Sequence, residues 1–183
     1  MKKGGIGGAN TNKTGLKFEK ETDFSEIVGS LENYSIEPIR YGNSTTLGFN
    51  VKNNENKIIG KIMSQYRFYD FLKEEGLDNS NSKKWKPDEA FINYENRTVY
   101  IIEKKWQETE GSVDEKLLGF GNKRRLYQRL LDQAERPFAV QFVFCGNSSW
   151  WNKDKYRDIY EMLRGDGIKI MLDEYEMGFF GLY

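Results

Sequence analysis

The chain contains no histidine among its 183 residues, and this lack removes several kinds of catalytic site. Serine hydrolases with a Ser-His-Asp triad and zinc sites built on histidine both need an imidazole. Nucleases of the HNH and phospholipase-D-like kinds need one as well. Catalysis by this chain would therefore depend on carboxylates and lysines.

Cysteine is almost as scarce, since Cys145 is the only one. A single cysteine cannot form an intramolecular disulfide or a zinc site of four cysteines. Because it follows the apolar run 138–144, we expect a buried, reduced thiol rather than a nucleophile. No apolar stretch approaches the length of a membrane span, and no signal peptide is evident. We therefore expect a cytoplasmic protein without a membrane partner.

The sequence also lacks a surplus of either charge, because 28 Lys and Arg balance 28 Asp and Glu. Most nucleic-acid-binding domains are basic overall, so binding here would depend on the local distribution of charge. Two segments concentrate basic residues that could neutralise phosphates. The candidate DNA-binding residues are Lys83, Lys84, Lys86, Arg124 and Arg125. For the two arginines, a solvated helix face is the alternative.

The segment that carries the most chemical information begins at Pro87-Asp88. Residues 89–94 and 98–102 are apolar and rich in β-forming residues, and Glu95-Asn96-Arg97 favours a turn. This pattern predicts a β-hairpin. Because side chains alternate across a strand, Glu103 and Lys105 would share one face while Lys104 points the other way.

Two carboxylates and a lysine at this spacing suit metal-dependent hydrolysis of phosphodiesters. Mg²⁺ prefers oxygen ligands and needs only one or two protein carboxylates, for which Asp88 and Glu103 are the candidates. The ammonium of Lys105 could stabilise developing charge or position a water molecule. The alternative is a surface hairpin that ends in a solvated run of charges.

Pro87, Asp88, Glu103 and Lys105 resemble the PD-(D/E)xK motif of a nuclease superfamily that includes many type II restriction endonucleases. The resemblance implies an α/β fold, a restriction-endonuclease-like mixed central β-sheet flanked by α-helices. It also implies Mg²⁺ as cofactor. The hairpin and the polar helix start that follows it look most similar to small restriction enzymes of the EcoRI and MunI kind.

The pattern downstream of the motif agrees with that fold. Ser112 and Glu115 stand at capping-box spacing, which predicts one helix from there to about Asp132. Residues 138–144 and 167–172 predict strands, and residues 156–163 predict an amphipathic helix between them. We expect a single domain over residues 1–183, which is long enough to bury a core.

Three further residues are candidates for the same site. Glu19 lies at a predicted helix start after the glycine-rich residues 4–8, and the resemblance implies a metal-ligand role, because related nucleases add a glutamate from their first helix. The alternative is an exposed helix residue after a frayed terminus. Glu115 and Lys116 would lie near the site or the DNA backbone, although helix capping alone explains Glu115.

The sequence thus predicts a Mg²⁺-dependent type II restriction endonuclease with Asp88, Glu103 and Lys105 as catalytic residues. Cutting both strands of double-stranded DNA implies a homodimer with two sites related by a two-fold axis. A Holliday-junction resolvase or DNA-repair endonuclease of the same fold is the nearest alternative. A non-catalytic DNA-binding protein is the alternative from a different class.

Overall fold

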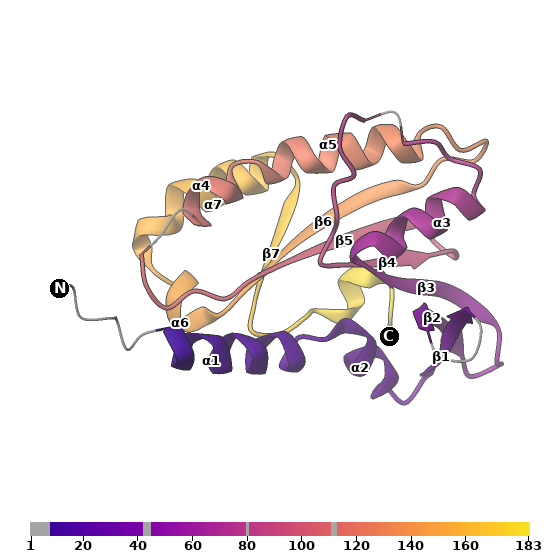
Figure 1. Cartoon of the computed structure of the whole chain (residues 1–183), viewed down its shortest axis with the longest axis horizontal. Coiled ribbons are helices and arrows are strands. Elements are labelled where there is room, and N and C mark those ends of the chain that lie inside the picture. The colour runs from indigo at the N-terminus through magenta and orange to yellow at the C-terminus, as the bar shows by residue number, and fades with distance from the viewer. Residues whose placement is uncertain (1–7, 42–44, 80, 111–112) are drawn as a thin grey trace.

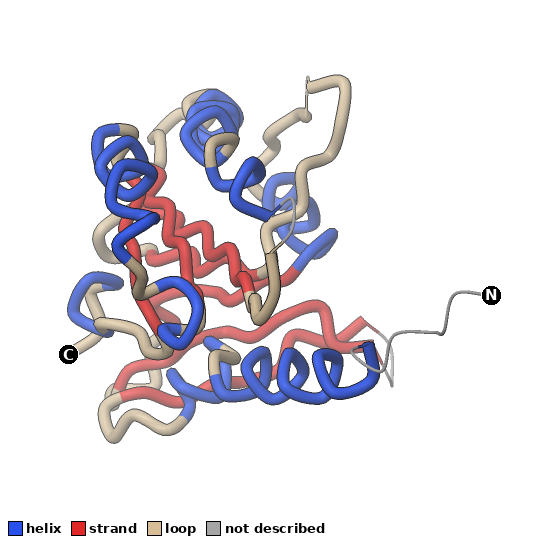
Figure 2. Tube along the Cα trace, turned by 90° about the vertical axis from the view of Figure 1, so that its left-hand side faces the viewer, coloured by secondary structure: helices blue, strands red, loops and turns tan. Residues whose placement is uncertain are grey.

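A computed structural model describes residues 8–41, 45–79, 81–110 and 113–183. Their strands form one seven-stranded sheet in the order β1-β2-β3-β4-β5-β6-β7 (Figure 1). Helices cover both faces of this sheet (Figure 2). The predicted α/β fold with a mixed central sheet is confirmed.

The sheet has an antiparallel half and a parallel half. Successive strands from β1 to β5 pair antiparallel, whereas β6 pairs parallel with β5 and β7 parallel with β6. The strands are β1 (Tyr34–Tyr41), β2 (Thr45–Asn53), β3 (Ile58–Ser64), β4 (Glu89–Asn93), β5 (Thr98–Lys105), β6 (Ala139–Gly146) and β7 (Ile168–Leu172). The candidate motif therefore lies at the centre of the sheet, with Pro87 and Asp88 immediately before β4 and Glu103 and Lys105 at the end of β5.

Each face of the sheet has its own set of helices (Figure 1). One face packs against α1 (Gly8–Glu21), α2 (Phe24–Gly29) and the C-terminal turn η3 (Met177–Phe180). The other packs against α3 (Phe68–Glu74), α4 (Val113–Leu117), α5 (Phe120–Leu131) and α7 (Arg157–Gly165). Short elements complete the chain: η1 (Gln65–Arg67), α6 (Ser148–Trp151) and η2 (Asp154–Tyr156).

The central hairpin is apolar on both faces because it separates two hydrophobic cores. Ile92 and Ile101 belong to the core under α5, and Phe91 and Ile102 belong to the core over α1 and α2. The side chain of Asn93 closes the turn by accepting hydrogen bonds from the backbone N–H groups of residues 95 and 96. The predicted hairpin is confirmed.

The helix predicted from Ser112 to Asp132 is wrong as a single element. Within the described residues it forms two helices, α4 and α5, with Leu118 and Gly119 between them. Glycine is a weak helix former, and the break lets the ring of Phe120 pack 5.1 Å from that of Phe142. Ser112, the expected capping residue, lies outside the described residues.

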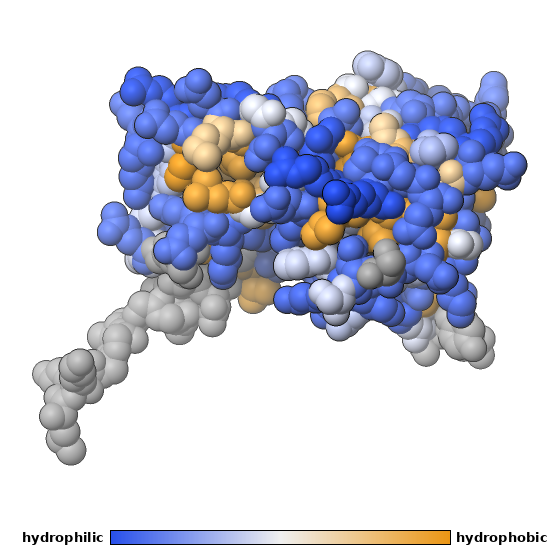
Figure 3. Space-filling view, turned by 90° about the horizontal axis from the view of Figure 1, so that it is seen from above, coloured by the Kyte–Doolittle hydropathy of each residue, from blue (hydrophilic) through white to orange (hydrophobic). Residues whose placement is uncertain are grey.

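The helix that carries Glu19 also begins earlier than expected. It runs from Gly8 to Glu21, so Glu19 lies in its last turn rather than at its start. The glycine-rich residues 4–7 lie outside the described residues. Seen from above, the face that carries α4, α5 and α7 is largely hydrophilic with separate hydrophobic patches (Figure 3). Within the described residues, no helix combines the length and apolar character of a membrane span.

Candidate active site

The register of the hairpin places Asp88 beside Glu103. Glu89 pairs with Ile102, so Asp88, one residue earlier, lies opposite the next residue of β5. The Oδ2 atom of Asp88 accepts a hydrogen bond of 2.8 Å from the backbone N–H of Lys104. The carboxylate is thus held against the end of β5.

One ammonium group joins the two carboxylates. The Nζ atom of Lys105 lies 3.3 Å from Oδ2 of Asp88 and 3.2 Å from Oε2 of Glu103. Burial would lower the pKa of Lys105, but the charges of Asp88 and Glu103 outweigh burial and raise that pKa. The group therefore stays charged at neutral pH, between two acidic oxygens.

Glu103 is the most buried member of the site, with 3% of the residue exposed. Its second oxygen, Oε1, lies 3.0 Å from Nζ of Lys123 on α5. A buried carboxylate is costly unless it is paired, and Glu103 has two ammonium partners. Lys123 was not among the site residues predicted from the sequence. Its helical spacing from Phe120 and Tyr127, both buried, is the signal that puts it on the inner face of α5.

Gln65 contacts Asp88 from the opposite side. Its Nε2 atom donates a 3.3 Å hydrogen bond to Oδ1 of Asp88, and its backbone N–H donates to the carbonyl of Pro87. The residue has a φ of 52°, a conformation that is uncommon for residues other than glycine. Such strained residues cluster at functional sites. Gln65 was not among the site residues predicted from the sequence.

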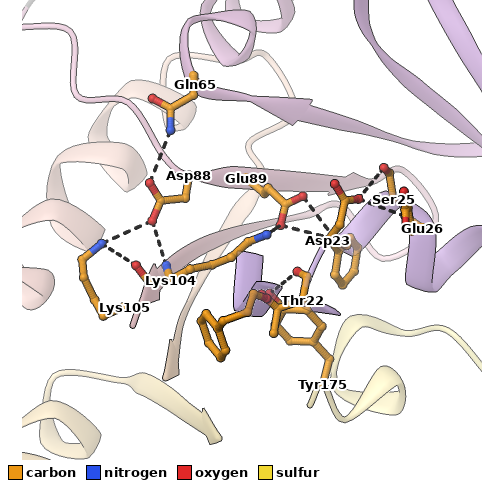
Figure 4. A network of polar contacts seen from close by, with 12 residues as sticks. Thr22, Asp23, Ser25, Glu26, Gln65, Asp88, Glu89, Lys104, Lys105 and Tyr175 are labelled. Atoms are coloured by element: carbon orange, nitrogen blue, oxygen red, sulfur yellow. Dashed lines mark hydrogen bonds and ion pairs between the residues drawn. The ribbon is translucent and has the colours of Figure 1, made fainter. Parts of the chain in front are cut away.

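A second charged pair, Glu89 and Lys104, lies next to Asp88 and Lys105 (Figure 4). The Nζ atom of Lys104 is 2.7 Å from Oε2 of Glu89, and their side chains are 10% and 8% exposed. Glu89 also accepts a hydrogen bond of 3.1 Å from the backbone N–H of Phe24, at the start of α2. Burial raises the pKa of Glu89 against the opposing influence of these partners. The predicted alternation of Glu103 and Lys105 against Lys104 is confirmed.

Two cavities flank the hairpin end. A cavity of about 390 Å³ on the α1 side is rich in carboxylates, which come from Glu19, Asp23, Asp88 and Glu89. A cavity of about 670 Å³ lies on the α5 side. It is lined by Trp85, Glu103, Lys105, Lys116, Gly119, Phe120, Asn122, Lys123 and Leu126.

The structure distributes the additional site candidates unequally. Glu19 is exposed and shares the acidic cavity with Asp88, and Lys116 lines the cavity on the α5 side. Glu115 is exposed and lines neither cavity. Among the described residues, no three acidic, histidine or cysteine side chains gather closely enough to hold a metal ion.

The candidate DNA-binding residues fall into two groups. Lys83, Lys84 and Lys86 are exposed on the loop that leads to Asp88, and the ammonium of Lys86 lies 3.5 Å from the ring centroid of Tyr66. Arg125 instead pairs with Asp166 at 3.2 Å, and the guanidinium of Arg124 lies beside Gly167. The two arginines thus pack at the turn between α7 and β7. Their predicted contact with DNA stays a prediction.

Comparison with known proteins agrees with this geometry. The sequence profile of the PD-(D/E)XK nuclease superfamily domain matches residues 80–129, which include the hairpin, α4 and most of α5. The matched segment contains Asp88, Glu103, Lys105 and Lys123. No curated protein and no solved structure matches the chain.

Proposed function

We propose that this protein is a Mg²⁺-dependent endonuclease that hydrolyses phosphodiester bonds of DNA at Asp88, Glu103 and Lys105. The observation that carries the proposal is the convergence of these three side chains through the Nζ atom of Lys105. The superfamily match over residues 80–129 supports a nucleic acid as substrate and hydrolysis as the reaction.

The donor set fits a hard divalent cation. Asp88 and Glu103 offer carboxylate oxygens, which are the ligands that Mg²⁺ prefers, and the ammonium between them marks a place that favours positive charge. Glu19 is the candidate for a further ligand because it lines the same cavity as Asp88. When bound, the metal would polarise the phosphoryl oxygen and acidify a water molecule.

The protein's own side chains have separate roles in this proposal. Lys105 carries a positive charge that stabilises the negative charge developing on the phosphate. Lys123 holds the buried carboxylate of Glu103, and Gln65 with the Lys104 N–H orients Asp88. Lys116, which lines the α5-side cavity, would contact the DNA backbone. Glu115, whose side chain is exposed, would act near the site.

The narrower form of the proposal is a type II restriction endonuclease that cuts a specific sequence of double-stranded DNA as a homodimer. One catalytic constellation per chain favours two chains for cleavage of two strands. The exposed Lys83, Lys84 and Lys86 would contact phosphates, while base edges would supply the sequence specificity. Arg124 and Arg125 would contact phosphates as well only if their side chains left the turn between α7 and β7.

Plasmid and phage DNA incubated with the purified protein and Mg²⁺ test the proposal. We expect cleavage that Asp88→Asn, Glu103→Gln and EDTA each abolish, and that Glu161→Gln, a change at an exposed position of α7, leaves unchanged. Discrete fragments with a common end sequence would establish a restriction enzyme. Cleavage confined to branched DNA would favour a junction resolvase. Binding without cleavage of any of these substrates would contradict the enzymatic proposal and leave a DNA-binding protein.

A further inference from the structure

The α5-side cavity joins the candidate catalytic residues to an aromatic surface. Its volume of about 670 Å³ lies within the range of sites that bind small organic groups, about 300–1,000 Å³. Glu103, Lys105 and Lys123 line one part, and Trp85, Phe120 and Leu126 line another. A group bound there would therefore lie directly beside Glu103 and Lys105.

The aromatic wall is held rigidly by the protein. The backbone carbonyl of Trp85 accepts hydrogen bonds from the hydroxyl groups of Tyr69 on α3 and Tyr127 on α5, at 2.8 and 3.0 Å. Asp88 follows three residues later. The same anchored segment therefore fixes the positions of the Trp85 indole and the Asp88 carboxylate. A wall fixed before the ligand arrives lowers the entropy cost of binding.

We propose that this cavity binds an unstacked nucleobase of the strand that is cut, next to the scissile phosphate. The proposal rests on the nuclease function proposed above and names its substrate class: DNA whose nucleotide at the cleavage point is unstacked, either because it is unpaired or because it turns out of the duplex. A base within a duplex is covered on both faces by its neighbours, so only an unstacked base can enter. Aromatic side chains bind such bases through their faces without regard to sequence.

The charges around the cavity support a nucleotide as the occupant. Lys116 and Lys123 line it with Lys105, and the ammonium of Lys83 lies 4.9 Å from the Trp85 ring centroid. These groups would neutralise the phosphates on either side of the base. The cavity on the α1 side is lined by four carboxylates, those of Glu19, Asp23, Asp88 and Glu89, against the two lysines Lys20 and Lys104, so without a bound metal it would attract phosphates less. The strand is therefore expected on the α5 side of the hairpin.

Binding measurements with base-free DNA isolate the cavity from the phosphate contacts. In EDTA, the anisotropy of a short labelled single strand is compared with that of a strand of equal length whose nucleotides are abasic. We expect the wild-type protein to bind the strand with bases about fivefold or more tightly, a typical effect of stacking on an aromatic side chain. Trp85→Ala should remove this preference, and Trp85→Phe should retain most of it.

Trp150→Ala is the matched control. Trp150 is also half-buried against the same core and also has a lysine ammonium over its ring, at 3.6 Å, but it does not line the cavity. It should keep the preference for bases. Circular dichroism would establish that each variant folds. An equal preference in wild type and Trp85→Ala would overturn the base-binding site.

A cleavage assay separates failure of this inference from failure of the nuclease function. With Mg²⁺, wild-type protein should cut a duplex that contains a mismatch or a one-nucleotide gap opposite the cleavage point about tenfold or more faster than the fully paired duplex. Cleavage of both at equal rates would overturn the inference and leave the nuclease intact. No cleavage of either would overturn the proposed function itself.

Discussion

At the scale of single residues, Glu103 depends most on its neighbours. Its carboxylate is almost fully buried and is matched by ammonium groups from two elements, Lys105 on the same strand and Lys123 on α5. An unpaired charge in such a place would turn toward water or take up a proton. The position of the candidate metal ligand is therefore set partly by a helix outside the motif.

Replacing Lys123 with methionine should lower the cleavage rate about tenfold to a hundredfold. The change keeps the length and packing of the side chain but leaves Oε1 of Glu103 without its partner, and misplacement of a reacting group by about 1 Å can cost a hundredfold. Single-turnover cleavage of DNA in Mg²⁺ measures the effect.

Arg129→Met is the control for that experiment, because Arg129 is exposed in the last turn of the same helix. It should change the rate less than about twofold. If both substitutions had equal effects, general loss of positive charge on α5 would explain them, and a specific role of Lys123 would be refuted.

The thiol of Cys145 should be inert in the folded protein. Burial raises its pKa to about 12, so only about one molecule in ten thousand carries a thiolate at pH 8, and the side chain is fully buried. We expect no reaction with a thiol reagent at that pH in the absence of denaturant and stoichiometric reaction in urea. Rapid reaction of the native protein would place the thiol at the surface instead.

At the scale of elements, the β4–β5 hairpin separates two charged networks with different roles. Glu103 and Lys105 line the cavity on the α5 side, and Lys105 joins Glu103 to Asp88 at the hairpin end. Glu89 and Lys104 instead face α2, where Glu89 also accepts a hydrogen bond from the Phe24 N–H. The first network lies at a cavity and contains the candidate catalytic groups. The second fixes the start of α2 to the sheet, and with it the helix that carries Glu19.

Breaking the Glu89–Lys104 pair from one side should destabilise the fold. Lys104→Met leaves a buried carboxylate without its ammonium, which costs about 3–5 kcal/mol of unfolding free energy. The double change Lys104→Met with Glu89→Leu should recover most of that loss, because neither charge then remains buried alone. Urea unfolding followed by tryptophan fluorescence measures all three proteins.

The exposed pair Lys17–Glu21, with side chains 72% and 61% exposed, provides the comparison for that cycle. Lys17→Ala should cost less than about 1 kcal/mol. A double variant as unstable as Lys104→Met would mean that the loss comes from packing or from the Phe24 hydrogen bond rather than from the unpaired charge.

The sequence was informative where a feature depends on neighbours along the chain. Alternation along one strand was enough to place Glu103 and Lys105 together and Lys104 opposite. The break between α4 and α5 was missed because it depends on Phe120 meeting Phe142 of a distant strand. Lys123 and Gln65 were not assigned to the site for the same reason, since α5 and η1 reach Asp88 and Glu103 only in the folded sheet.

At the scale of the whole molecule, positive and negative charges balance. The local arrangement of charged residues therefore decides where a nucleic acid could bind. The net charge is zero, so the proposed binding of DNA would depend on lysines near the site, and the acidic cavity on the α1 side would restrict the side from which a strand approaches. Each chain provides one pair of carboxylates at β4 and β5. A single chain bound at one point on a duplex could therefore cut one strand per binding event.

A mixed dimer tests whether two chains act together. Wild-type and Asp88→Ala chains carrying different affinity tags are produced together and purified through both tags in turn. If the protein is a homodimer in which each chain cuts one strand, the mixed species should convert supercoiled plasmid to the nicked form and accumulate little linear DNA. The wild-type dimer should proceed to linear DNA under the same conditions. Failure to recover protein through both tags would show that the chains do not associate stably, and linear product from the mixed species would show that a single intact site cuts both strands in succession.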